Sequence, residues 1–375
     1  MKKQLAFLVA ALALQSCIYK YTPNIDFEQV KHTLVVDGKI LIGGTSTIQL
    51  TYLQPVSGAA ASMPVGNVWI EDNKNNRFLP DETAQKQSNA FVIPTPPSGA
   101  SEYRAVIECD GETYMSDWIT PDPAPEIKEI RFEADASQVH VRADIKTDVN
   151  NLGYVGFTFE ETWEFHSDFY PQIFVNPETW EYYVPVQDYP YYWCYKIYKD
   201  PGISVLDVTG LVPDDEGIIH GVDIKNFSRS DSRNHKKYSI LLNAFALSKD
   251  AYDFNRQMAE MASAGGDLFT PDPGILPTNL SCSSHPERPV MGMVLAGGVS
   301  QKRVFFESTY YIPRTPNVSF MNVTQEDMPT FYYELNYRPV KWVMIEDEMV
   351  VGWAAHRCIN CIEAGGTQEK PDYWK

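Results

Sequence analysis

Short runs of alternating polar and apolar residues recur between residues 33 and 118, and they restrict this part of the chain to β structure. Residues 47–53 alternate with a period of two, which is typical of a strand with one buried face. Asp110-Gly111 separates two apolar runs, and this dipeptide favours a tight hairpin turn. About seven such strands predict an immunoglobulin-like or transthyretin-like β-sandwich over residues 31–122.

A proline-rich segment, residues 121–125, ends this domain, because proline cannot continue a strand ladder and favours extended backbone. Residues 123–375 are predicted to form a larger β-rich domain, with a long strand at residues 153–165. One substantial helix is expected near residues 248–263, with Ser248 as its N-cap. Its apolar stripe comprises Ala251, Phe254, Met258 and Met261. The fold class is therefore mainly β.

The N-terminus has the features of an export signal. Lys2 and Lys3 precede an apolar run, and a small residue precedes Cys17. We expect residues 1–16 to be a lipoprotein signal peptide, with Cys17 carrying the acyl chains (palmitate or similar) that anchor the protein in a membrane. An ordinary signal peptide or a buried N-terminal helix remains the alternative. Residues 17–30 lack periodicity and are expected to be a tether. The formal charge of −18 argues against nucleic acid as a partner.

Export would place the cysteines in an oxidising compartment, where disulfides persist. Cys17 is assigned to the lipid, and Cys109 ends a strand-like run as a small buried residue. The remaining disulfide candidates are Cys194, Cys282, Cys358 and Cys361. We predict that the last two bond to the first two, in an order that the sequence does not assign, pinning the C-terminal tail and Trp374 to the second domain. A zinc site, a redox-active C-x-x-C pair and free thiols are the alternatives.

An aromatic segment, residues 163–198, is the strongest compositional anomaly. Tyr and Trp combine an apolar ring with a polar tip, so they suit interfaces and platforms that stack on sugars. Two interpretations remain open: an interface or ligand surface, and a long loop whose rings point into the core. The candidate surface residues are Trp180, Tyr182, Tyr183, Tyr189, Tyr191 and Tyr192.

Motifs for catalysis are not found in the sequence. The seven histidines form no H-E-x-x-H motif, and there is neither a G-x-S-x-G elbow nor a phosphate-binding glycine loop. Glu160-Glu161 and Asp214-Asp215-Glu216 contain neighbouring carboxylates, but adjacent strand residues point to opposite faces. No catalytic residue, metal ligand or cofactor is therefore predicted.

The C-terminal residues carry a family resemblance. Cys358-x-x-Cys361, Gly365-Gly366-Thr367 and Lys370-Pro371-x-x-Trp374 resemble the closing signature of a Bacteroidetes lipoprotein family catalogued as domain of unknown function 4249. The resemblance implies an outer-membrane lipoprotein with an immunoglobulin-like N-terminal domain, whose gene often lies beside that of a TonB-dependent transporter. No enzymatic activity is established for that family.

The resemblance predicts a non-enzymatic accessory or substrate-binding partner of such a transporter. Two alternatives are a stand-alone surface module that binds a glycan, a peptide or another small ligand, and an unrecognised hydrolase. The side of the outer membrane on which the protein faces is left open.

Overall fold

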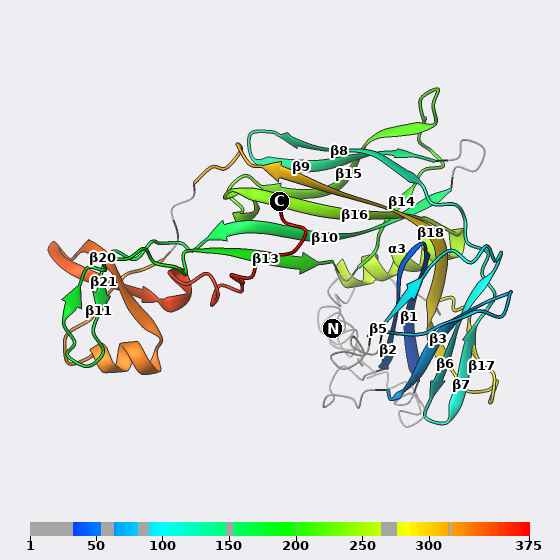
Figure 1. Ribbon diagram of the computed structural model, residues 1–375, viewed down its shortest axis with the longest axis horizontal. Coiled ribbons are helices and arrows are strands. Elements are labelled where there is room, and N and C mark those ends of the chain that lie inside the picture. Colours follow the sequence, from blue (N-terminus) through cyan, green and yellow to red (C-terminus); the bar gives the residue numbers. More distant parts are fainter. Residues whose placement is uncertain are drawn as a thin grey trace, which may run out of the picture.

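The computed structural model describes residues 33–53, 64–81, 90–147, 153–200, 202–263, 276–313, 316 and 318–375. The described chain is mainly β, as predicted (Figure 1). The predicted signal peptide, tether and Cys17 lie outside the described residues. The first seven strands are β1 (Leu34–Ile42), β2 (Gly44–Tyr52), β3 (Gly66–Asp72), β4 (Arg77–Phe78), β5 (Ala90–Thr95), β6 (Tyr103–Cys109) and β7 (Glu112–Ser116).

These strands form a β-sandwich that also uses two strands from much later in the chain. β17 (Leu280–Cys282) pairs with β7, and the first half of β18 (Val290–Glu307) runs parallel to β1. One sheet is ordered β18-β1-β2-β5 and the other β17-β7-β6-β3-β4, with Ile48 and Ile107 buried between them. The predicted domain limit at residue 122 therefore needs correction, because these late strands complete the first sandwich.

A single 18-residue strand, β18, joins the two halves of the molecule. Its second half pairs antiparallel with β16 (Lys237–Leu247), so one eight-stranded sheet runs through both sandwiches. Gly292 has a φ of 101°, and a Cβ atom there would lie 1.9 Å from the carbonyl oxygen of Val36. The parallel pairing with β1 thus requires glycine at this position.

The second sandwich contains β8 (Glu126–Ala134), β9 (Gln138–Lys146), β10 (Tyr154–His166), β13 (Trp193–Lys199), β14 (Ser204–Asp207) and β15 (Ile218–Ser228), together with β16. Here the long sheet is ordered β13-β10-β16-β18, and β14 pairs with the start of β10. The β15-β9-β8 sheet covers one face of it (Figure 1), with Val141, Phe157 and Leu242 in the shared core.

The predicted helix is present as α3 (Lys249–Ser263). The hydroxyl of Ser248 accepts a hydrogen bond from the Ala251 N–H at 3.2 Å, which confirms the N-cap. Only the first half of the apolar stripe is covered, because Ala251 is buried whereas Met258 and Met261 are exposed. The proline-rich linker lies along β18, where the Gly298 N–H donates to the Asp122 carbonyl.

A third unit extends from the far end of the second sandwich (Figure 1). We name residues 168–192 and 318–358, which build it, the distal module. Its elements are β11 (Phe174–Val175), β12 (Tyr182–Tyr183), β19 (Met321–Asn322), β20 (Tyr337–Ile345), β21 (Glu348–Ala355) and the helical turns η2 (Thr330–Glu334) and η3 (His356–Cys358). Ile173, Val323 and Trp353 belong to its small core. The sequence places this region inside one large domain, without separating the module.

The C-terminal tail is pinned to the second sandwich. Cys361 forms a disulfide with Cys194, which confirms half of the predicted pairing. Cys282 and Cys358 are buried free thiols, so the second predicted bond is wrong; Cys282 belongs to the first sandwich, where β17 pairs with β7. Cys109 is also buried and free, as expected. The Trp374 indole packs against Tyr195 and donates to Glu164 at 2.8 Å, which confirms the docking of the tail.

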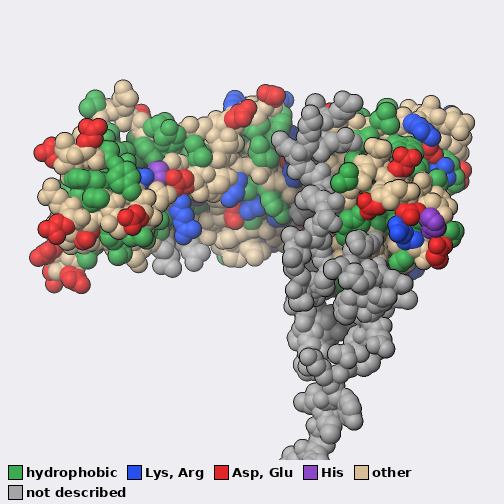
Figure 2. All heavy atoms as spheres, turned by 90° about the horizontal axis from the view of Figure 1, so that it is seen from below, with side chains coloured by type: hydrophobic (Ala, Val, Ile, Leu, Met, Phe, Trp, Pro, Cys, Tyr) green, Lys and Arg blue, Asp and Glu red, His purple; other side chains and the backbone are tan. Residues whose placement is uncertain are grey.

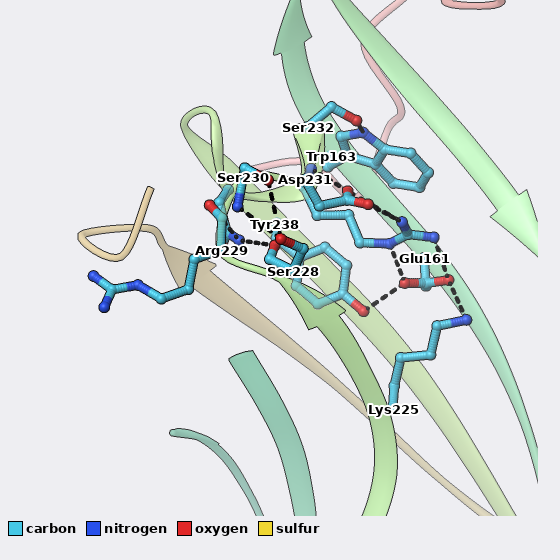
Figure 3. A network of polar contacts seen from close by, with 11 residues as sticks. Glu161, Trp163, Lys225, Ser228, Arg229, Ser230, Asp231, Ser232 and Tyr238 are labelled. Atoms are coloured by element: carbon cyan, nitrogen blue, oxygen red, sulfur yellow. Dashed lines mark hydrogen bonds and ion pairs between the residues drawn. The ribbon is translucent and has the colours of Figure 1, made fainter. Parts of the chain in front are cut away.

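A buried ionic network ties β10 to the turn η1 (Ser232–Asn234) and to β16 (Figure 3). The Glu161 carboxylate is fully buried and accepts hydrogen bonds from Arg233 and from the Tyr238 hydroxyl at 2.7 and 2.9 Å. The Lys225 ammonium lies 3.5 Å from the Glu161 carboxylate. Burial opposes the charge on Arg233, but Glu161 outweighs it and raises the pKa of the guanidinium. The network is structural, since partners satisfy both carboxylate oxygens.

Candidate functional site

The aromatic segment is divided between two environments. Trp163 and Phe165 on β10 are buried in the core of the second sandwich, which matches the interpretation that the rings point inward. Residues 168–192 instead build the distal module, where several rings reach the surface. The inward interpretation therefore holds for the first part of the segment, and an interface or ligand role for the exposed rings stays a prediction.

Trp180 lies in a hydrogen-bonded loop between β11 and β12. The Asn176 N–H donates to the Glu181 carbonyl at 3.0 Å, and the Trp180 N–H donates to the Asn176 carbonyl at 2.8 Å. The Asn176 side chain also accepts from the Glu178 N–H. These bonds hold Trp180 at a φ of 59°, a left-handed conformation that costs a bulky residue roughly 1–3 kcal/mol. Such local strain is most often retained where a side chain must be presented in one orientation.

Two neighbouring rings are fixed by packing. The Tyr182 hydroxyl accepts a hydrogen bond from the indole N–H of Trp353 at 2.9 Å, and Trp353 is fully buried. Burial raises the pKa of Tyr182, because the phenolate would be poorly solvated there. The Trp180 ring meets Tyr332 and Tyr333 edge-on, with centroids 6.0 Å apart in each pair. Trp180 and Tyr182 are thus preorganised before any ligand arrives.

A shallow groove of about 440 Å³ lies beside these rings. We name it the Trp groove; its walls include Trp180, Glu181, Tyr182, Asn322, Gln325 and Trp342. Trp342 is 57% exposed, although it belongs to a β-strand. Ring faces offer stacking surfaces, and the adjacent amide and carboxylate groups offer hydrogen bonds. A groove of this composition suits a ligand that has both apolar faces and hydroxyl or amide groups.

The hairpin of β20 and β21 projects beyond the groove. Met344 faces Met349 across the hairpin, and each side chain is 60% exposed. Trp342 lies on the same face, because it is two residues from Met344. Glu346 and Asp347 form the turn, both at positive φ. Figure 2 shows hydrophobic side chains gathered on this end of the molecule, with acidic side chains beside them.

The six predicted surface residues do not form one site. Trp180 and Tyr182 line the Trp groove, and Tyr183 beside them is half exposed. Tyr189 is half-buried, and burial raises its pKa to about 12. Tyr191 is partly exposed, whereas Tyr192 stacks on His166 near the second sandwich.

Sequence reasoning missed the groove residues that come from β19 and β20. Trp342 lies in a run of apolar residues that predicts a buried strand, so nothing local marked it as exposed. Asn322 and Gln325 carry no motif at all. Their relation to Trp180 exists only in the folded chain, where β11 and β12 lie beside the β19-β21-β20 sheet.

The neighbouring carboxylates face opposite ways, as expected for a strand. Glu160 binds Arg303 and the Tyr373 hydroxyl, whereas Glu161 belongs to the buried network. Burial opposes ionisation of Glu160, but hydrogen bonds from Arg303 and Lys199 outweigh it and lower its pKa. Asp214 caps a turn by accepting the Glu216 and Ile218 N–H groups. Within the described ranges, no group of three His, Cys, Asp or Glu side chains could hold a metal ion.

Comparison with known proteins identifies the family but not an activity. Residues 18–303 match the family described as a domain of unknown function (DUF4249). The match ends before β19 and before the tail motif that carried the sequence resemblance. No curated protein matches the chain. In the part of the chain that the structure describes, no helix is long and apolar enough to cross a membrane. Because the match covers most of its length, the chain belongs to the DUF4249 family.

Proposed function

We propose that this chain is a lipid-anchored, non-enzymatic binding protein of the outer membrane, acting as an accessory or substrate-binding partner of a TonB-dependent transporter. One observation carries the proposal: the distal module presents the Trp groove and an apolar hairpin at the end of the molecule opposite the first sandwich (Figure 1). The lipidated residue would be Cys17, which precedes that sandwich in the chain.

The composition of the hairpin favours a protein partner. Exposed apolar patches on monomers mark interaction sites, and Trp, Tyr and Met are enriched in interface cores. Trp342, Met344 and Met349 supply this core. The acidic turn at Glu346 and Asp347 would form part of a charged rim, so the partner surface should be apolar with basic residues around it.

Photo-crosslinking in intact cells tests this contact. A photoreactive phenylalanine analogue replaces Met344 or Met349, and as a control it replaces Leu79, which is 66% exposed on the first sandwich. We expect one outer-membrane transporter to be trapped from positions 344 and 349 but not from position 79. Equal capture from all three positions, or none from the hairpin, would overturn the assignment.

The anchor has its own test. Cys17→Ser should release the protein from the membrane fraction or leave the signal peptide uncleaved. An unchanged mature mass in the outer-membrane fraction would show that Cys17 carries no lipid.

A second function, glycan binding, is supported by the pairing of aromatic rings with amide groups in the Trp groove. Ring faces stack on the C–H face of a pyranose, while Asn322 and Gln325 would bind its hydroxyl groups. Isothermal titration of the intact protein with a panel of oligosaccharides measures this directly. Trp342→Ala should abolish binding without lowering the melting temperature, whereas Trp118→Ala, at an exposed tryptophan of the first sandwich, should leave binding unchanged. If no oligosaccharide binds, the groove serves the protein partner alone.

A further inference from the structure

A larger cavity, of about 750 Å³, lies where the C-terminal tail meets the second sandwich and η1. We name it the tail cavity; its walls include His166, Asp168, Lys196, His235, Tyr311 and Arg357. It is separate from the Trp groove, and the described lining residues of the two sites do not overlap. Its volume is within the range of roughly 300–1,000 Å³ that is usual for small-molecule sites.

A column of stacked rings stands at one side of this cavity. The rings of His166 and His235 are parallel, with centroids 4.0 Å apart. Tyr192 stacks on the other face of this pair at 5.0 Å from His166, and Tyr311 meets His235 edge-on at 4.7 Å. The column therefore offers ring edges and faces to an apolar body in the cavity.

Hydrogen bonds fix the orientation of both imidazoles. His235 accepts the backbone N–H of His166 at its Nδ1 atom, at 3.2 Å, so in the neutral ring the hydrogen is on Nε2. The Nδ1 atom of His166 lies 2.7 Å from the Ser167 carbonyl, to which it donates. Burial, with a smaller contribution from His166, lowers the pKa of His235 to about 4. His235 is therefore a neutral hydrogen-bond donor at pH 7, and it adds no charge to the cavity.

Two cations face the cavity without an acidic partner. Among the described residues, neither Lys196 nor Arg357 forms an ion pair with a carboxylate; the Lys196 ammonium makes a long contact of 3.5 Å with the Ala364 carbonyl and lies 5.9 Å from the Phe165 ring centroid. This is unusual in a chain with 49 acidic and 31 basic residues, where nearby Lys236 is paired with Glu164. Asp168 is the one carboxylate among the described lining residues. Apart from the histidines, the described lining residues carry two positive charges and one negative charge, a net charge of one positive unit.

We propose that the tail cavity binds a small organic monocarboxylate, with its carboxylate between Lys196 and Arg357 and its apolar body against the ring column. Arginine matches a carboxylate with two parallel hydrogen bonds, and a single negative charge balances the lining. A dianionic ligand would leave an excess charge beside Asp168. The inference goes beyond the proposed function, because it concerns a second site with its own ligand class.

One wall is formed by Arg357 of η3 and by Ala364 of the C-terminal tail. The disulfide between Cys194 and Cys361 holds that wall against β13. Ligand binding in the cavity should therefore depend on the disulfide, which gives the proposal a second, independent readout.

Calorimetric titration of the full lipidated protein in detergent tests the site. The probes are acetate, benzoate and indole-3-acetate, each compared with its uncharged amide, and inorganic phosphate. We expect at least one monocarboxylate to bind more tightly than its amide. Arg357→Gln and Lys196→Gln should each weaken that binding about tenfold or more, and so should reduction of the disulfide. Lys199→Gln provides the matched control, because Lys199 is on the same strand but does not line the cavity.

The outcomes separate clearly. The proposal is overturned if no monocarboxylate binds better than its amide, if phosphate alone binds, or if the two cavity variants bind like the Lys199→Gln control. Melting temperatures of all variants establish that each is folded. The imidazole proton resonances of His166 and His235 give a second measurement, and a bound carboxylate should shift them in the wild-type protein but not in Arg357→Gln.

Discussion

Replacement of Glu161 by glutamine should destabilise the second sandwich strongly, although the side chain keeps nearly the same volume. The carboxylate is fully buried and accepts hydrogen bonds from two nitrogens of Arg233, at 2.7 and 3.2 Å, and from the Tyr238 hydroxyl (Figure 3). Glutamine offers one acceptor oxygen in place of two and turns an NH₂ group toward other donors. The guanidinium, with 16% of its side chain exposed, then keeps its charge with only Asp231 as a partner.

The size of the stability loss follows from the uncompensated charge of Arg233. Removing one member of a buried ion pair typically costs about 3–5 kcal/mol, because the other charge stays buried without compensation. Asp231 remains 3.1 Å from Arg233 and reduces that penalty, so we expect a loss of about 3 kcal/mol. Glu129→Gln is the matched control: it also removes a carboxylate paired with an arginine, but Glu129 is 61% exposed. Exposed pairs contribute about 0–1 kcal/mol, so the control should lose less than that.

Urea unfolding followed by tryptophan fluorescence measures both variants. Trp163 reports on this region directly, since the Arg233 guanidinium lies 4.5 Å from its ring centroid. The double variant Glu161→Leu with Arg233→Met should recover most of the lost stability, because it removes both buried charges together. The argument is that each buried charge is stabilised by its partner. It would be refuted if Glu161→Gln lost less than about 1 kcal/mol of unfolding free energy, or if the double variant recovered none of the loss.

Three further outcomes are expected. Replacing Cys194 and Cys361 together by serine should lower the free energy of unfolding by about 5 kcal/mol, the value of the chain-entropy model for a loop of 167 residues. Urea unfolding measures this loss, and a loss below about 1 kcal/mol would contradict the entropic estimate. The pKa of His235 is lowered from 6.5 to about 4, so the unfolded chain binds this proton more readily and stability falls as the pH drops from 6.5 toward 4. His235→Phe should remove that part of the decrease, seen as a flatter curve of melting temperature against pH. Gly292→Ala should cost at least about 2 kcal/mol through its positive φ and its contact with Val36, and an unchanged melting temperature would disprove the requirement for glycine.

Local patterns predicted the elements that bury one face along a short stretch of chain. The alternation in residues 47–53 identified β2, and Asp110-Gly111 identified the turn between β6 and β7. The N-cap at Ser248 placed the start of α3 correctly. In each case the signal depends on residues close in sequence, where periodicity and turn chemistry act directly. The candidate site was predicted in part, since the aromatic segment included Trp180 and Tyr182 but gave no sign of Trp342.

The sequence by itself determined the class of this protein: a mainly β chain of the DUF4249 family, with a C-terminal tail in which one cysteine, Cys361, forms a disulfide. Only the tertiary structure decided the rest. In the folded chain, β18 pairs with β1 and β17 pairs with β7, so both late strands belong to the first sandwich. Asn322 and Trp342 line the same groove as Trp180. The tertiary structure also placed Lys196 and Arg357 in the lining of one cavity, with no ion-pair partner among the residues that the structure describes. The physical reason is that strand pairing is set by shape and burial between distant segments, and these long-range contacts leave no mark in the local pattern of either partner.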